Sequence, residues 1–243
     1  MPIKKYVADA DNTIVNAFQS NLQTRGTGAN AGAADILETF SIYGRQASGS
    51  QELSRILVKF PTTAISTDRT AGDIPASGSV NFYLRLFDAE TSKTVPRNLD
   101  IVVLAISQSW QEGFGLDLEN YKDITYTNEG SNWMSASNTA FWTDINGTLL
   151  AGGSYHTQSV PNADVNTEIH IFKKRLANGL EDLEVNITPL VEQWLAGTYA
   201  NYGVGIALSA SQEAYVSGAF NLATKRTPQL PDPADSTRTT IYN

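Results

Sequence analysis

The chain has 243 residues, of which 25 are acidic and 17 basic, for a formal net charge of -8, and it has no cysteine. The apolar share of 41% is enough to build a core, and the length suits one large domain or two small ones. The missing cysteines exclude disulfides and thiolate chemistry. The acidic balance argues against nucleic acid as a partner, because phosphate contacts need clustered Lys and Arg. No apolar run is long enough to span a membrane, and no signal peptide is apparent at the start.

Apolar and polar residues alternate with a period of two along most of the chain, as in strands with one face in a core. Ile56 and Val58 would face one side of such a strand, and Arg55 and Lys59 the other. The sequence predicts strands at 7–18, 36–43, 54–60, 80–86, 99–106, 124–127, 168–173, 183–187, 204–209 and 214–222. Many short strands joined by polar turns predict an all-β sandwich or barrel.

One short helix is predicted, at about residues 188–196. Thr188 can cap its start. Pro189 suits the first helical position, because the backbone N–H that proline lacks would have no hydrogen-bond partner at that position. Gly197 can supply the left-handed stop. The apolar face, which includes Trp194, is expected to close one end of the sandwich.

Residues 223–243 are predicted to form an extended arm that follows a sandwich domain at residues 1–222. The arm carries three prolines and few apolar residues, a composition typical of an extended, weakly packed segment. Its last residues are strand-like again and would pair on their own sheet, add to the edge of a neighbour's sheet, or remain a frayed tail without a partner. The residues expected to serve assembly are Pro228, Pro231, Pro233, Ile241 and Tyr242.

No pattern of catalytic residues stands out. His156 and His170 are the only histidines, and no nucleophile, phosphate-loop or zinc-protease motif accompanies them. Glu168 and His170 could share a strand face, but two ligands are too few for a metal site, and a solvent-facing pair is favoured. Asp9 and Asp11 suggest calcium, although a turn is favoured there. We therefore predict no enzyme activity, no metal and no cofactor.

Aromatic residues in the middle of the chain leave two interpretations open. Rings exposed on a β-sandwich can stack on sugars, whereas buried rings fill the core, and the second interpretation is favoured. The candidates for glycan stacking are Trp133, Trp142, Tyr126 and Tyr155.

Several motifs follow one another in a set order. An Asp-led strand at 11–17 precedes a Gly/Asn-rich turn and the arginine-led strand that contains Arg55. A Trp-Gln-Glu-Gly element at 110–113 comes later, and the predicted helix then precedes an apolar strand at 201–208. In this order they resemble the DNRLRE-type domain, a jelly-roll β-sandwich also seen in carbohydrate-binding modules. The segments that carry the resemblance are 11–17, 28–32, 36–38, 54–60, 74–86, 109–113, 132–133, 185–194 and 201–208.

Four residues of these motifs are expected to hold the fold, namely Arg55, Trp110, Glu112 and Trp194. Arg55 should pair with a carboxylate or with carbonyl groups near a sheet end, because an unpaired buried guanidinium is very costly.

A cysteine-free, acidic sandwich with a proline-containing arm also looks like a bacteriophage virion protein. This resemblance implies a non-enzymatic structural subunit, such as a capsid decoration, neck or tail component, located in the virion. It would assemble with copies of itself and with other virion subunits through its sheet surfaces and its C-terminal arm. The alternative is a carbohydrate-binding module that recognises a polysaccharide or a host-surface glycan through exposed aromatics.

Overall fold

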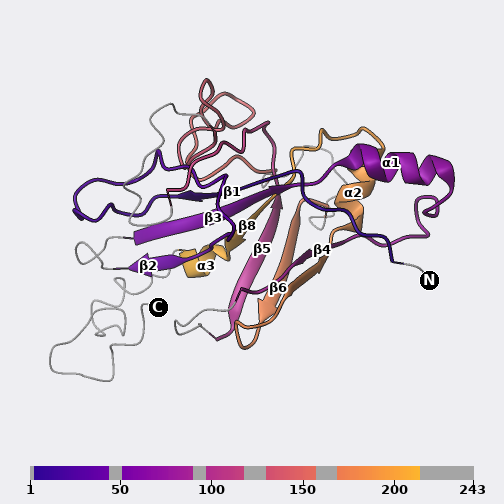
Figure 1. Cartoon of the computed structure of the whole chain (residues 1–243), viewed down its shortest axis with the longest axis horizontal. Coiled ribbons are helices and arrows are strands. Elements are labelled where there is room, and N and C mark those ends of the chain that lie inside the picture. Colours follow the sequence, from indigo (N-terminus) through magenta and orange to yellow (C-terminus); the bar gives the residue numbers. More distant parts are fainter. Residues whose placement is uncertain (1–2, 44–50, 90–96, 118–129, 157–168, 214–243) are drawn as a thin grey trace.

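The computed structural model describes residues 3–43, 51–89, 97–117, 130–156 and 169–213 (Figure 1). Within these ranges, strands dominate and the helices are few and short. The strands are β1 (Ala10–Val15), β2 (Ser41–Tyr43), β3 (Gln51–Lys59), β4 (Tyr83–Leu86), β5 (Leu99–Ala105), β6 (Ile171–Leu176), β7 (Leu183–Asn186) and β8 (Val204–Leu208). The helices are α1 (Thr62–Ala71), α2 (Thr188–Leu195) and α3 (Ala210–Glu213). None of these helices is long and apolar enough to cross a membrane.

The strands form two antiparallel sheets. The larger sheet has the order β1-β3-β8-β5-β6, and β2 adds to the end of β3 beside β8. Its registers include Asp11 opposite Val58 and Val103 opposite Ile206. The smaller sheet contains β4 and β7, with Leu84 opposite Val185. The predicted all-β class is therefore confirmed.

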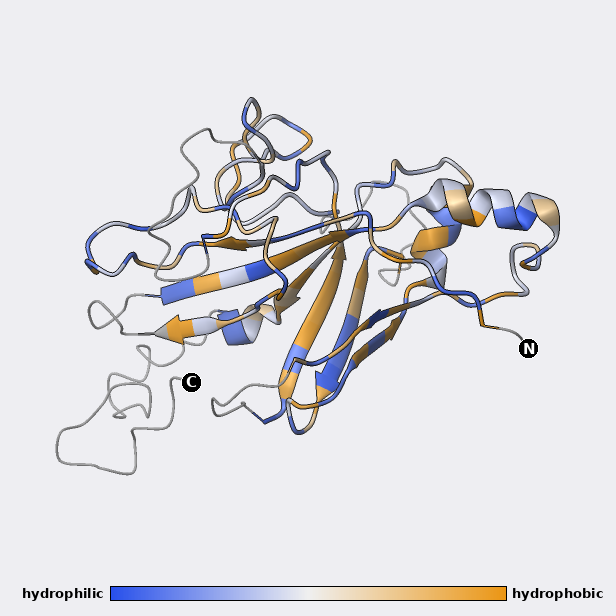
Figure 2. Ribbon diagram, viewed as in Figure 1, coloured by the Kyte–Doolittle hydropathy of each residue, from blue (hydrophilic) through white to orange (hydrophobic). Residues whose placement is uncertain are grey.

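The main core lies between the large sheet, the small sheet and the helices α1 and α2. The large sheet supplies apolar side chains such as Ile56, Val103 and Ile206, and these pack with residues that include Leu84 of β4 and Leu190 of α2. Figure 2 shows the matching apolar stretches along β3, β5 and β8. Burying an aliphatic side chain of this size stabilises the fold by about 1.5–3 kcal/mol, so this cluster holds the two sheets together.

A second core covers the opposite face of the large sheet. There Ile14 of β1 and Leu57 of β3 pack against Trp133 and Trp142. The two tryptophans belong to irregular chain at residues 107–117 and 130–156, here called the loop layer, which lies above β1 and β3 in Figure 1. Because Ile56 and Val58 enter one core and Leu57 the other, β3 is buried on both faces.

The predicted helix is confirmed as α2, but its start differs from the expectation. Ile187 is the capping residue, and Thr188 lies inside the helix. The Thr188 hydroxyl instead accepts a hydrogen bond from the backbone N–H of Phe82 at 2.7 Å, which ties the helix to the segment before β4. Gly197 adopts the expected left-handed conformation, with φ of 73°.

The prediction of a single helix is wrong, because α1 and α3 also form. Helix α1 buries only Ile65 and otherwise consists largely of Thr, Ser and Asp, so its sequence has no apolar period to reveal it. It ends at Gly72, whose φ of 82° is readily adopted by glycine. Helix α3 has four residues, too few for a period to be recognised.

Three predicted strands are markedly shorter than expected, and one is shifted. The strand predicted at 80–86 forms only at β4, and the one predicted at 168–173 is displaced toward the C-terminus as β6. The segment 36–43 forms a strand only at β2, because the Ser54 hydroxyl accepts the Phe40 N–H and donates to the Glu38 carbonyl. The segment 7–18 narrows to β1. The predicted strands at 124–127 and 214–222 lie outside the described residues, as does the arm at 223–243.

Candidate functional site

A largely buried ion pair anchors the last described turn of the chain. Arg55 of β3 donates two hydrogen bonds to the carboxylate of Glu213, at 2.9 and 2.7 Å, and a third to the carbonyl of Gly152 at 2.6 Å. Its guanidinium also lies 5.3 Å from the Trp133 ring centroid and 5.8 Å from that of Tyr155. Arg55 thus has both kinds of partner expected from the sequence, a carboxylate and a carbonyl.

The charge of Arg55 is held by these partners. Burial alone would lower the pKa of its guanidinium, but the hydrogen bonds and charge of Glu213, together with Tyr155, outweigh burial and raise it. Burial is also the main cause of the raised pKa of Tyr155, against which Arg55 acts in the opposite direction. The site is therefore built to keep one positive charge paired inside the protein.

Gln212 fixes the same turn to the large sheet. Its side chain accepts the N–H of Asp100 at 3.0 Å and donates to the carbonyl of Asn98 at 3.1 Å. Its own carbonyl accepts the hydroxyl of Ser41 in β2 at 3.3 Å. The chain after Glu213 consequently starts from a fixed point beside β2 and the beginning of β5 (Figure 1).

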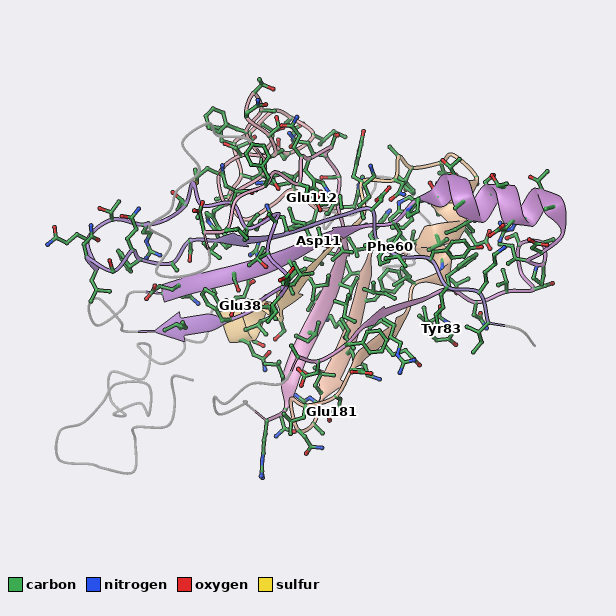
Figure 3. The ribbon with its side chains drawn as sticks, viewed as in Figure 1. Asp11, Glu38, Phe60, Tyr83, Glu112 and Glu181 are labelled. Atoms are coloured by element: carbon green, nitrogen blue, oxygen red, sulfur yellow. The ribbon has the colours of Figure 1, made fainter. Side chains whose placement is uncertain are left out.

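A buried polar network joins β1 to the loop layer. The Asn12 amide donates to the carbonyl and hydroxyl oxygens of Ser131, and the Asn30 amide donates to the carbonyls of Glu112 and Ser131. The carboxylate of Glu112 accepts the backbone N–H of Asp11 at 2.8 Å. Figure 3 shows Asp11 and Glu112 beside each other at this junction. Satisfied networks of this kind favour one arrangement of the backbone over others.

The two tryptophans expected to hold the fold pack in different cores, Trp110 against the second and Trp194 in the main one. Trp110 donates its indole N–H to the carbonyl of Tyr202 at 2.7 Å, linking the loop layer to the chain before β8. Trp194 is buried in the main core from α2.

Two of the candidate glycan-stacking residues are wrong. Trp142 is 0% exposed, and Trp133 is only 7% exposed, so neither ring presents a face to a sugar. Both fill the second core, where Trp142 also donates its indole N–H to the carbonyl of Asn132. Tyr155 is half-buried and lies against Gly153 and Gly205. Tyr126 lies outside the described residues, as do the five arm residues named for assembly.

The loop layer carries exposed apolar side chains and few charges. Six large apolar side chains are exposed there, namely Phe114, Leu116, Met134, Phe141, Ile145 and Leu149. Between residues 130 and 156, Asp144 is the only Asp, Glu, Lys or Arg. Its carboxylate accepts hydrogen bonds from the backbone N–H groups of Thr148 and Asn146 in the same turn. These bonds stabilise the charged form and lower the pKa of Asp144. Exposed apolar side chains with little charge around them are frequent at protein contact sites.

The sequence did not reveal this surface. Phe141, Thr143 and Ile145 alternate with Trp142, and Thr143 lies opposite Leu149 in a short hairpin. The hairpin therefore turns Trp142 into the core and Phe141, Ile145 and Leu149 outward. Alternation around Trp142 was the available signal, but it was obscured by the surrounding Ser, Asn and Gly residues.

The two histidines meet beyond the end of β5. The rings of His156 and His170 stack with centroids 5.0 Å apart, and Tyr199 contacts both. The Nε2 atom of His170 is buried and has no hydrogen-bond partner among the described residues. Burial lowers the pKa of both histidines, and His170 lowers that of His156 further. Both rings are therefore held in the neutral form at neutral pH.

This pair should make stability fall on mild acidification. In the unfolded chain both histidines protonate near their ordinary pKa of 6.5, whereas the folded chain resists protonation. The loss of unfolding free energy then begins as pH drops through about 6.5 and continues toward the lower folded pKa values. Urea unfolding at pH 7.5, 6.5 and 5.5 measures it, and the double variant His156→Gln/His170→Gln should flatten the profile. An equally steep decline in the double variant would contradict this assignment.

The described residues contain no group of three or more His, Cys, Asp or Glu side chains placed to hold a metal ion. Glu168, the suggested companion of His170, lies outside those residues. Asp11 belongs to β1, with Asp9 in a bend just before it, so the turn favoured at this point is replaced by the start of a strand. Burial and the nearby Glu112 raise the pKa of Asp11.

Comparison with known proteins gives no relative. No family of known sequences, no curated protein and no solved structure matches the chain.

Proposed function

We propose that the chain is a non-enzymatic structural subunit of a bacteriophage virion, such as a capsid decoration, neck or tail component. It assembles with copies of itself and with other virion subunits through its sheet surfaces, its loop layer and its C-terminal arm. We also propose that its sheets follow the jelly-roll arrangement implied by the resemblance to the DNRLRE-type domain. Repeated copies in a particle multiply weak contacts through effective concentration, so modest surfaces suffice for such a role.

The observation that carries this proposal is the set of exposed apolar side chains on the loop layer, among which few residues are charged. Ile145 is 98% exposed and Phe141 is 59% exposed, on a hairpin whose inner residue Trp142 is fixed in the core. A rigid base beneath exposed apolar side chains lowers the entropy lost when a partner binds. The anchored turn at Glu213 adds support, because it fixes the point from which the proposed C-terminal arm leaves the described part of the chain.

Surface variants and sedimentation test the proposal. The double variant Phe141→Asp/Ile145→Asp should weaken self-association or binding to other particle proteins by about tenfold or more, because it places charges in a desolvated contact. Ile3→Asp is the matched control, since Ile3 is 87% exposed but lies near the N-terminus, away from the loop layer. Equal association of both variants would remove the loop layer from assembly. Mass spectrometry of purified phage particles should find the chain at a constant ratio to the other subunits, and its absence would overturn the proposed function.

The alternative proposal, glycan recognition, retains one supporting observation. Phe141 is exposed beside uncharged polar residues such as Asn138 and Thr139, and an exposed ring can stack on a sugar. A glycan array probed with the chain and with Phe141→Ala distinguishes the two functions. Retention that disappears in the variant supports a carbohydrate-binding module.

A further inference from the structure

We propose that the outer edge of β4 accepts the strand-like run at residues 239–242 from a second copy of this chain. This inference rests on the proposed assembly function and names the two parts that join. The acceptor lies in the described small sheet, and the donor lies in the C-terminal arm. The proposal identifies which sheet edge an incoming strand would extend.

The register of the small sheet shows which backbone groups of β4 point away from β7. The Ile187 N–H donates to the Phe82 carbonyl at 2.9 Å, and Leu84 lies opposite Val185 two residues further on. In an antiparallel pair, hydrogen-bonded and non-hydrogen-bonded positions alternate. The N–H and carbonyl groups of Tyr83 and Arg85 therefore face outward, and no backbone hydrogen bond joins them to any other described residue.

The strand that carries this edge is firmly held. Leu84 is buried in the main core, and β7 pairs with all four residues of β4. A strand fixed in this way offers its outward groups without further ordering, which reduces the entropic cost of pairing. Figure 3 places Tyr83 on the outside of this part of the molecule.

The side chains beside the edge suit an incoming apolar strand. Tyr83 and Phe87 are exposed, and the Arg85 guanidinium lies 5.0 Å from the Phe87 ring centroid. Arg85 is the charged residue of β4, and it lies near Asp182 and Glu184, at 3.4 and 3.9 Å. Exposed edge strands are normally protected by charges, prolines or bulges. Here the aromatic side chains of Tyr83 and Phe87 flank the edge, and the charge of Arg85 is already paired with Asp182 and Glu184.

The run Thr239-Thr240-Ile241-Tyr242 matches this acceptor in length and pattern. β4 has four residues, and the run has four residues of high strand propensity. Because side chains alternate along a strand, Ile241 can join the core side with Leu84 while Thr240 and Tyr242 lie outside near Tyr83. Two or more main-chain hydrogen bonds then form at the groups that β7 leaves free.

The position of the arm's origin favours a second copy as the donor. Glu213 is anchored beside β2, on one side of the molecule, whereas β4 lies on the other side (Figure 1). Twenty-five residues separate Glu213 from the run (214–238), which is about 80 Å when fully extended. Pro228, Pro231 and Pro233 favour extended chain. We therefore assign the donor to a second copy, because a chain of this composition can reach a neighbour without reversing its direction across its own sandwich.

A proline in the β4 edge tests the acceptor. Arg85→Pro removes an N–H that faces away from β7, so it blocks an added strand while leaving the ladder to β7 intact. Arg85→Ala is the matched control, because it loses the same ion pairs but keeps the N–H. By sedimentation velocity, Arg85→Pro and a truncation after Phe220 should each weaken self-association by about tenfold or more, and Arg85→Ala should not. Equal association of the proline and alanine variants would overturn the acceptor.

Cross-linking tests the donor without relying on the proline variant. Because the chain has no cysteine, Tyr83→Cys and Thr240→Cys can be made as single variants, mixed, and treated with a short bis-maleimide. We expect a cross-linked dimer, and none when Ile145→Cys replaces Tyr83→Cys. In a chain that carries both cysteines, a cross-link confined to monomers would show pairing within one chain and overturn the second copy as donor. Either failure leaves the loop-layer test of the proposed function unaffected.

Discussion

Replacing Trp142 with alanine is expected to lower the free energy of unfolding by about 3–5 kcal/mol, the range for a large buried aromatic. The Trp142 side chain is completely buried in the second core and donates a hydrogen bond to the carbonyl of Asn132. Its loss leaves a cavity beneath the loop layer and a carbonyl without its donor. Equilibrium denaturation in urea or guanidinium measures the change.

Phe141→Ala is the matched control for Trp142→Ala, because the two residues are neighbours and Phe141 is exposed. Its effect should stay within about 0.5 kcal/mol. Should Trp142→Ala unfold at the same denaturant concentration as the unchanged protein, the second core would not be a core. A Trp142→Ala protein that keeps its stability and loses sugar retention would restore the glycan-stacking interpretation of this residue.

Breaking the Arg55–Glu213 ion pair should produce the second large effect. Removing one member of a fully buried pair costs about 3–5 kcal/mol, since it leaves the other charge uncompensated. The Arg55 and Glu213 side chains are 19% and 14% exposed, so solvent screening reduces the expected cost to about 2–4 kcal/mol. We expect this loss for Glu213→Ala, and a larger loss for Arg55→Ala, which also gives up the bond to Gly152 and the contacts with two aromatic rings.

A double-mutant cycle separates the ion pair from these other contacts. Arg55→Met, Glu213→Leu and their combination should show a coupling energy of about 1–3 kcal/mol, with the double variant more stable than the sum of the single losses predicts. Additive losses would mean that the two charges do not stabilise one another. Arg85→Ala, which removes an exposed ion pair at the edge of the small sheet, is a control expected to change stability by less than about 1 kcal/mol.

The strands could be predicted because their apolar residues alternate or run together. β5 shows this best, since an almost unbroken apolar segment became a strand between β8 and β6 in which the consecutive residues Ile101, Val102 and Val103 are all buried. Helix α2 could be placed from Pro189 and Gly197. Helix α1 could not, because only Ile65 faces the core and no period distinguishes its threonines from those of a loop.

The second core was harder to predict for a different reason. Its cover is loop, and loop residues have no period from which inward and outward positions can be read. Trp133 and Trp142 therefore looked equally suited to a sugar platform or a core until the structure placed them against Leu57. The partner of Arg55 could be foreseen in kind, as a carboxylate, but not in identity, because Glu213 is 158 residues away in the sequence.

Because β3 is buried on both faces, the stability of the sheets and the stability of the loop layer depend on one another. The consecutive side chains of Ile56, Leu57 and Val58 enter opposite cores. Removing either the loop layer or the small sheet with its helices would therefore expose aliphatic side chains of β3 to water. The sheets therefore depend on the loop layer for their stability and would not be expected to fold without it. Shortening or grafting its hairpins would have to preserve the inward tryptophans, whereas substitutions at the outward positions Phe141, Ile145 and Leu149 would leave the second core intact.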